Sequence, residues 1–341
     1  KTENNELRML VSDNWQLDPA YEYLIGLDPQ TGKLMPGLAT EWTLDAEAMA
    51  YRFKLRKGVP FAGGYGEVTS QDLIASFKEL TKEDSTQGSS PFFRQTVKQI
   101  EPVGDGEVVY KLTTPTGEFL PSLSQERTGA EIFSAAHLAK NGPATMASGP
   151  IAGTGPYQFE SRQQGAYIRF QRAANHWRVT PDFPQLEFRF LKEPSTRLAA
   201  LMTGEVQMAA LPQDLMPGAE RAGMKVLKGQ FPGVRVFGRF HCCSFAQEPW
   251  KPDVAWRTPD SPLMNVNVRK AMQKAVNLDE LNRAFFAGKG EPMPVTHLHP
   301  RGNEGWDPTW DRRFKDEYGY NPEEARKLLA RHEAIEKRRK S

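Results

Sequence analysis

The 341-residue chain carries 44 Lys and Arg residues against 42 Asp and Glu residues, a formal net charge of +2, and 39% of its residues are hydrophobic. Its length exceeds what one ordinary core buries and predicts two or three domains. The nearly balanced charge, without a basic stripe, argues against nucleic-acid binding. No apolar run of about 18 residues is present that could span a membrane as a helix.

Hydrophobic periodicity predicts strands mixed with helices along the chain. Residues 51–55 alternate between apolar and basic side chains, as a half-buried strand does. Thr69 and Asp72 have capping-box spacing, and Asn321 with Glu324 marks a later helix start. The mixture lacks strict βαβ alternation, so it predicts an α/β protein with mixed sheets. Strands are predicted over 7–11, 51–55, 107–112, 166–172, 186–191 and 234–240, and helices from 70, over 92–100, 196–203, 268–276 and 278–287, and from 321.

A glycine-rich run, GTGPYQF at residues 153–159, has the pattern of a turn that leads into a strand. Gly153 and Gly155 supply backbone freedom, and Pro156 fixes φ. The run lacks the third glycine of a dinucleotide-binding fingerprint. A second short run, NHW, follows at residues 175–177.

Other runs stand on both sides of GTGPYQF in a defined order. They are LDPAY (17–21), LMPGLATEW (34–42), YRFKLRKGVPF (51–61), TSQDLIASF (69–77), RLAALMTGEVQMAAL (197–211), NVRKAMQKAVNLDEL (267–281) and NPEEARKLLA (321–330). In this order the runs resemble the large extracytoplasmic solute-binding proteins of peptide and nickel ABC importers, the oligopeptide- and dipeptide-binding family. The resemblance extends from about residue 9 to residue 330.

The resemblance implies a two-lobed, clamshell α/β fold of the periplasmic-binding-protein type. Domain I then comprises residues 1–24 and 151–240, domain II is an insertion over 25–150, and domain III begins at 241. Family members continue well beyond the point that matches residue 330, so we expect the second lobe, residues 241–341, to be incomplete. The family's helix after LDPA is also missing from the sequence.

The resemblance further implies a binding protein and not an enzyme, without cofactor or metal. It would capture a peptide or similar-sized solute and deliver it to an ABC permease, as a monomer without a nucleic-acid partner. Export to the periplasm or cell exterior is implied, with lipid anchoring as an open alternative; the polar residues 1–6 carry no signal peptide, as in a mature chain. The alternative is a degenerate member that docks a partner or acts as a sensor.

Candidate ligand-binding residues follow from the matched runs. They lie after LDPA, at the start of the helix predicted over 92–100, and on the strand where domain III begins. Each aromatic among them also suits a core position. The residues are Tyr21, Glu22 and Tyr23, then Phe92, Phe93 and Arg94, then His241, Cys242, Cys243 and Phe245.

Two further groups leave alternatives open. Cys242 and Cys243 are adjacent, which favours two free thiols over a cramped disulfide. His297 and His299 share one face of an extended segment and could hold a transition metal with His241 or with the two cysteines. Two solvent-facing loop histidines fit the same pattern better, and the sequence does not identify the ligand.

Overall fold

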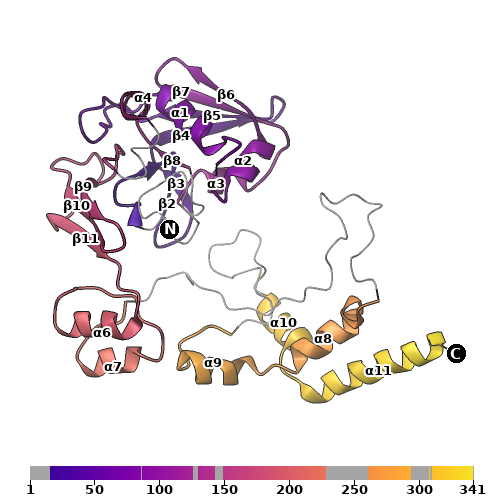
Figure 1. Ribbon diagram of the computed structural model, residues 1–341. Helices are drawn as coiled ribbons and strands as arrows, with labels where there is room; N and C mark the ends of the chain where they lie inside the picture. The colour runs from indigo at the N-terminus through magenta and orange to yellow at the C-terminus, as the bar shows by residue number, and fades with distance from the viewer. Residues whose placement is uncertain are drawn as a thin grey trace. The chain divides into compact units, whose positions relative to one another are not determined.

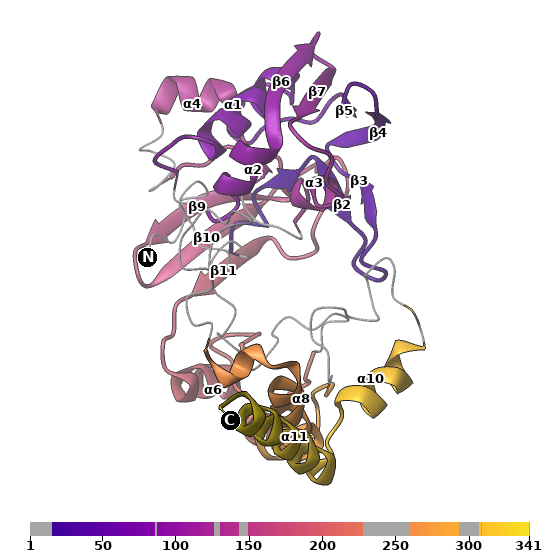
Figure 2. The same ribbon diagram turned by 90° about the vertical axis from the view of Figure 1, so that its right-hand side faces the viewer.

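The computed structural model describes residues 16–85, 87–125, 130–142, 149–227, 260–292, 307 and 309–340. The chain divides into two compact units, unit 1 over residues 1–191 and unit 2 over residues 192–341 (Figures 1 and 2). The described strands all belong to unit 1, and the described part of unit 2 is helical. Within the described ranges, no helix is both long and apolar enough to cross a membrane.

A four-stranded antiparallel sheet, in the order β4-β5-β7-β6, forms the main core of unit 1 (Figure 1). Phe53 of β5 and Tyr110 of β7 are buried and meet edge to face, with ring centroids 5.6 Å apart. Helices α1 and α2 contact this sheet and add Leu73 and Phe93 to the same core. Each such side chain contributes about 1.5–3 kcal/mol by burial. The elements are β4 (Ala39–Asp45), β5 (Ala50–Leu55), β6 (Val97–Val103), β7 (Glu107–Leu112), α1 (Ser70–Leu80) and α2 (Ser90–Thr96).

The opposite face of this sheet is polar. Side chains alternate along each strand, so the residues flanking Phe53 point away from the core. Oppositely charged side chains meet there across neighbouring strands, which suits a solvated face and contributes little to stability per pair. The pairs are Arg52–Glu107 (2.7 Å), Lys54–Glu41 (3.0 Å) and Lys111–Glu101 (2.8 Å).

A three-stranded antiparallel sheet, in the order β11-β10-β9, carries the second core of unit 1 (Figure 2). Ile168 and Phe170 of the central strand are fully buried against Leu17, Tyr21 and Phe133. This core therefore joins residues from both ends of unit 1. The strands are β9 (Tyr157–Gln163), β10 (Tyr167–Arg172) and β11 (Gln185–Arg189).

Short elements connect the two cores. The predicted capping box at Thr69 is present, and the buried Asp72 carboxylate also accepts a 2.8 Å hydrogen bond from the backbone of Ala135. This bond ties the start of α1 to the start of α4. The connecting elements are β1 (Glu22–Tyr23), which pairs with β8 (Glu131–Ile132), β2 (Ile25–Leu27), which pairs with β3 (Leu34–Pro36), α3 (Phe119–Ser122) and α4 (Ala135–Asn141).

A buried histidine in α4 predicts sensitivity of unit 1 to acid. His137 is 1% exposed, packs edge-on against Tyr65 with centroids 4.8 Å apart, and its Nε2 has no hydrogen-bond partner among the described residues. Burial lowers the pKa of His137; the Pro150 carbonyl opposes this effect, and the Lys140 charge adds to it. Since the unfolded chain then binds more protons, stability is expected to fall as the pH drops below about 6.5.

The measurement is the urea midpoint of unfolding at pH 7.5 and at pH 5. We expect His137→Gln to lose less stability between these pH values than the unsubstituted chain does. His332→Gln is the control, because His332, in the helix α11 (Pro322–Lys340), is only partly buried. An unchanged pH dependence in His137→Gln would contradict the prediction.

Unit 2 is described as a set of helices. Ala271 of α8 packs against Ala325 and Leu328 of α11, and the buried Lys274 donates from Nζ to the backbone oxygen of Asp316 at 3.0 Å. That bond places a cation at the carboxyl end of α10, where the helix dipole favours it. The helices are α6 (Pro194–Met202), α7 (Met216–Arg221), η2 (Pro262–Met264), α8 (Val266–Lys274), α9 (Leu278–Phe286), α10 (Trp310–Tyr318) and α11 (Pro322–Lys340).

Most predicted elements are confirmed within a few residues. The helix predicted over 92–100 is wrong in its second half, because α2 ends at Thr96 and Val97 begins β6, which pairs with β7. The predicted strands over 7–11 and 234–240 lie outside the described residues. The confirmed strands are β5, β7, β10 and β11, and the confirmed helices are α1, α6, α8, α9 and α11.

Candidate functional site

Two distant runs of the sequence meet through their backbones in unit 1. The N–H of Gly155 donates to the Ala20 oxygen at 3.0 Å, and that of Tyr157 donates to the Pro19 oxygen at 2.9 Å. A Cβ on Gly155 would lie 2.4 Å from the Pro19 oxygen, and one on Gly153 only 2.1 Å from the Ala20 oxygen. Glycine is therefore required by the close approach of two backbones. The junction places β1 beside the GTGP turn.

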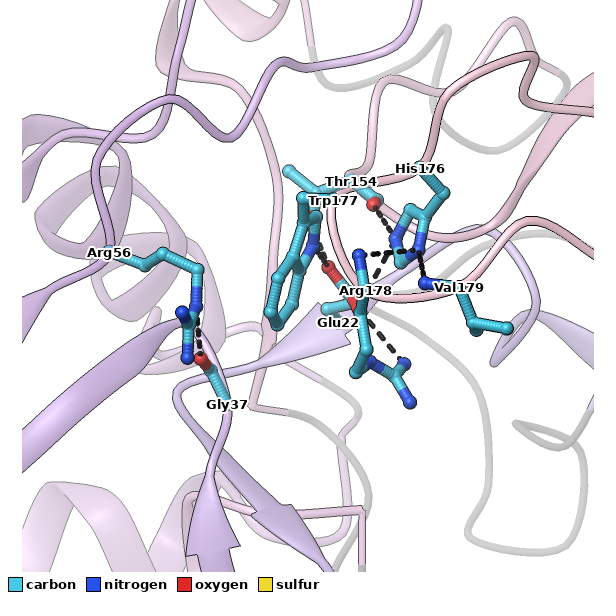
Figure 3. Close-up of polar contacts among 8 residues, drawn as sticks. All are labelled: Glu22, Gly37, Arg56, Thr154, His176, Trp177, Arg178 and Val179. Atoms are coloured by element: carbon cyan, nitrogen blue, oxygen red, sulfur yellow. Dashed lines mark hydrogen bonds and ion pairs between the residues drawn. The ribbon is translucent and has the colours of Figure 1, made fainter.

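Glu22 of β1 is the centre of a buried polar cluster at this junction (Figure 3). The residue is 6% exposed, and its carboxylate accepts hydrogen bonds from Thr154 Oγ1 at 3.0 Å, Trp177 Nε1 at 2.6 Å and Arg178 Nη2 at 3.0 Å. The Nε2 atom of His176 lies 3.4 Å from the same carboxylate. Glu22 is thus surrounded by donors from two segments more than 130 residues away.

His176 is held in one orientation and one tautomer. Its Nδ1 accepts hydrogen bonds from the backbone N–H groups of Arg178 at 3.3 Å and Val179 at 3.1 Å. Its Nε2 lies 3.0 Å from the backbone oxygen of Thr154. Because Nδ1 accepts, the proton of the neutral ring is on Nε2, where both the Thr154 oxygen and Glu22 face it.

The cluster keeps Glu22 ionised. Burial by itself raises the pKa of a carboxyl group, but the hydrogen bonds from His176, Trp177 and Arg178 outweigh it here and leave the pKa of Glu22 below its ordinary value. The carboxylate therefore serves as a fixed anchor for the segment 176–178.

Trp177 is held on its ring faces as well as at its nitrogen. The guanidinium carbon of Arg56 lies 4.5 Å from the ring centroid, and that of Arg178 lies 5.7 Å from it. In Figure 3 the indole stands between these two side chains. Arg56 is fixed in turn by a 3.3 Å hydrogen bond from Nε to the Gly37 oxygen. Cation–π contacts of this kind contribute about 0.5–1 kcal/mol when partly exposed.

A pocket of about 270 Å³ opens beside this cluster. Its walls come from the loop 60–64, from the GTG turn at 153–155, from Gln158 and from residues 173–177. The N–H of Ala62 donates to the Gly153 oxygen at 2.9 Å and joins the two loops. The pocket is smaller than most ligand sites, so it suits one group of a ligand more than a whole ligand.

Tyr21 and Tyr23 lie on the other side of β1. Tyr21 belongs to the core beneath the three-stranded sheet. The hydroxyl of Tyr23 lies 3.0 Å from an oxygen of Asp18 and 3.2 Å from an oxygen of Glu131. Burial, and then these two carboxylates, raise the pKa of Tyr23 well above its ordinary value. Both side chains are buried and belong to the packed interior of unit 1.

Phe92, Phe93 and Arg94 belong to α2 and not to the cluster around Glu22. Phe93 is fully buried in the main core, with Phe92 packed against it at 5.4 Å. Arg94 donates to the Lys82 oxygen and to Ser90 Oγ, both at 2.7 Å. The hinge-strand candidates His241, Cys242, Cys243 and Phe245, and the paired His297 and His299, lie outside the described residues.

The residues that surround Glu22 include several that the sequence did not single out as site residues. Thr154, His176 and Trp177 lie in the GTGPYQF and NHW runs, so the runs themselves were the available signal. Arg56 lies in the YRFKLRKGVPF run, whereas Arg178 lies just after NHW and carried no such signal, because an exposed basic residue is ordinary. Among the described residues, no group of three or more His, Cys, Asp and Glu side chains could hold a metal ion.

Comparison with known proteins gives a consistent result. The model of the bacterial extracellular solute-binding proteins, family 5, matches residues 33–338. The dipeptide-binding protein of Escherichia coli strain K12 is 26% identical over 91% of this chain and 57% of its own length. The probable di/tripeptide-binding protein 5 of Pseudomonas aeruginosa is 28% identical over 94% of this chain and 60% of its own length. The chain thus spans less than two thirds of these relatives.

Solved structures with the same fold are periplasmic binding proteins. The protein DppA of Helicobacter pylori, in complex with the peptide STSA, superposes with a TM-score of 0.64 at 20% identity, over 97% of this chain and 64% of that one. The dipeptide-binding protein of Pseudoalteromonas sp. SM9913, in complex with Met-Leu, gives a TM-score of 0.62 at 21% identity, over 93% and 64%. The predicted α/β fold of this type is confirmed.

Proposed function

The chain belongs to the bacterial extracellular solute-binding proteins, family 5, and from this membership we propose that it is the substrate-binding component of an ABC importer. It captures a peptide, or a solute of similar size, and delivers it to a membrane permease. The observation that carries the proposal is the family match over residues 33–338. The relatives named for dipeptides and di/tripeptides favour a peptide as the solute.

The geometry of unit 1 supports a binding role. Binding sites of this type need a wall whose side chains are fixed before the ligand arrives, because ordering them on binding costs affinity. Trp177 is fixed at its nitrogen by Glu22 and on its ring by Arg56. We assign Glu22 the role of positioning this wall from behind, and propose His241, Cys242 and Phe245 as direct ligand contacts.

The remaining parts of the proposal concern partners and place. The protein acts as a monomer, without catalytic activity, and its partners are the solute and the permease. It works in the periplasm or at the cell exterior, and attachment to the cell surface by a lipid is compatible with that role. The family description as extracellular supports this location.

Mass spectrometry of the purified chain tests the function. The protein is measured first under native conditions and then after denaturation, which releases small molecules that it carries. We expect released peptides, or a mass shift when di-, tri- and tetrapeptides are added to the native protein. A folded chain that neither releases nor binds any of these peptides would contradict the proposal.

A further inference from the structure

The pocket beside Trp177 has walls without charged side chains. Of the residues that line it, none is Asp, Glu, Lys or Arg. The loop 60–67 contains one acidic residue, Glu67, and its carboxylate accepts a 3.1 Å hydrogen bond from the Gly58 N–H. A charged ligand group that enters the pocket would therefore not contact a side chain of opposite charge. Its binding would depend on the hydrogen-bond donors of the wall and on the charges behind the wall.

Hydrogen-bond donors line the pocket without partners of their own. The backbone N–H groups of Gly63 and Gly64 make no hydrogen bond to any described residue, and both glycines have φ of +77°. The side-chain amides of Gln158 and Asn175 are likewise unbonded within the described part of the chain. Such groups can all donate to an oxygen of a ligand, and backbone N–H groups suit a carboxylate especially.

The charge behind the wall is positive. Trp177 lines the pocket and carries Arg56 and Arg178 within 6 Å of its ring. The Glu22 carboxylate accepts a hydrogen bond from one of these guanidinium groups, that of Arg178, and also from Thr154 and Trp177. The two guanidinium groups and the one carboxylate together leave one positive charge in excess. Arg56 makes no ion pair with any described residue and leaves that excess uncompensated.

We propose that this pocket is a subsite for a carboxylate group of the bound solute, and that it disfavours cationic groups. Gly63, Gly64 and Asn175 supply the donors, while Arg56 and Arg178 supply the favourable potential through the Trp177 wall. The carboxylate is either the carboxyl terminus of a peptide or an acidic side chain. The identification of the solute as a peptide rests on the proposed function, whereas the preference for a carboxylate rests on the pocket alone.

Nuclear magnetic resonance tests the subsite without any assumption about the solute. Acetate, acetamide and methylammonium are titrated into the ¹⁵N-labelled chain at constant ionic strength. We expect acetate to give saturable shifts of the Trp177 indole N–H, assigned by its absence in Trp177→Phe, and of the Gly63 and Gly64 amides. Acetamide and methylammonium should shift them weakly. Equal responses to acetate and to the chloride used as the balancing salt would overturn the proposal.

Charge substitutions sharpen the test. Asn175→Asp places a negative charge on the exposed wall and should weaken acetate binding by about tenfold, as a like charge does at a partly exposed site. Arg56→Gln should weaken it in the same direction. Lys57→Gln is the matched control, because it removes one charge at the neighbouring exposed position. Equal weakening in Lys57→Gln and Arg56→Gln would reduce the effect to net charge and overturn the assignment.

Peptide binding then identifies the source of the carboxylate. Ala-Asp-Ala, Ala-Asn-Ala and the carboxyl-amidated form of each are compared on the unsubstituted chain and on Asn175→Asp. Loss of selectivity for Asp over Asn indicates a side-chain carboxylate, and loss of selectivity for the free terminus indicates the terminal one. If acetate binds at Trp177 but no peptide binds anywhere, the proposed function fails and the carboxylate subsite stands.

Discussion

Replacing Glu22 with glutamine is expected to lower the free energy of unfolding by about 3 kcal/mol. The carboxylate accepts hydrogen bonds from three side chains and faces a fourth, and glutamine offers one acceptor oxygen and an NH₂ group that competes with the donors. Breaking a buried, paired charge typically costs about 3–5 kcal/mol, because the partners stay behind unpaired. Urea unfolding monitored by circular dichroism measures the loss.

The matched control is Glu41→Gln. Glu41 pairs with Lys54 on the solvated face of the four-stranded sheet, and its side chain is 64% exposed. The same chemical change there should cost less than about 1 kcal/mol. If both variants lost a comparable free energy of unfolding, the burial of Glu22 would not explain how much it contributes to stability.

Glu22→Gln should also change how the stability of the chain depends on pH in acid. The pKa of Glu22 lies below its ordinary value because the hydrogen bonds from His176, Trp177 and Arg178 outweigh the effect of burial. A carboxyl group with a depressed pKa stabilises the folded chain above the pKa of the unfolded state, about 4.5, and this stabilisation is lost as the pH falls through the folded value. Glu22→Gln should therefore flatten the stability profile below pH 4.5.

Local signals in the sequence predicted the elements whose structure is decided locally. The capping box at Thr69 and the cap at Asn321 both form as their spacing predicts. The alternation over 51–55 correctly identified the buried Phe53 of β5. Such signals suffice because the residues that carry them lie within one turn or one strand of each other.

The helix predicted over 92–100 shows where local signals fail. Its apolar residues fit a helix by spacing, but Val97 begins β6, which pairs with β7 from Glu107 to Leu112. The pairing partner follows a turn further along the chain, and its contribution outweighs the weak local preference of the segment. Residues 92–100 alone do not contain the pairing partner, so their local sequence could not indicate that the second half forms an edge strand.

The candidate site was predictable only as a set of neighbouring runs. Glu22 was predicted as a ligand-binding residue, and its buried carboxylate accepts hydrogen bonds from residues 154, 177 and 178. Periodicity in a two-residue strand cannot tell which side chain faces the interior. The LDPAY and GTGPYQF runs were informative because their contact is made by backbone, which restricts the sequence at both places.

The close approach of these two backbones predicts a large effect of one added methyl group. Gly155→Ala should lower the free energy of unfolding by at least about 3 kcal/mol, at the upper end of overpacking costs. The new Cβ would lie 2.4 Å from the Pro19 oxygen and 2.5 Å from the Ala20 carbonyl carbon, and backbone atoms cannot rotate away as a side chain can. Separation of the two segments would also break the Gly155–Ala20 and Tyr157–Pro19 hydrogen bonds.

Gly117→Ala is the control for this change, because a Cβ on Gly117 meets no atom within 4 Å and its φ is not in the left-handed region. That variant should unfold within about 0.5 kcal/mol of the unsubstituted chain. If the free energy of unfolding of Gly155→Ala equals that of Gly117→Ala, the LDPA and GTGP segments can separate without loss of stability. The position of Glu22 would then have to be maintained by the hydrogen bonds of its own carboxylate. In that case Gly155→Ala should keep the acid response of the unsubstituted chain. If the junction instead positions Glu22, the substitution should weaken both stability and that response together.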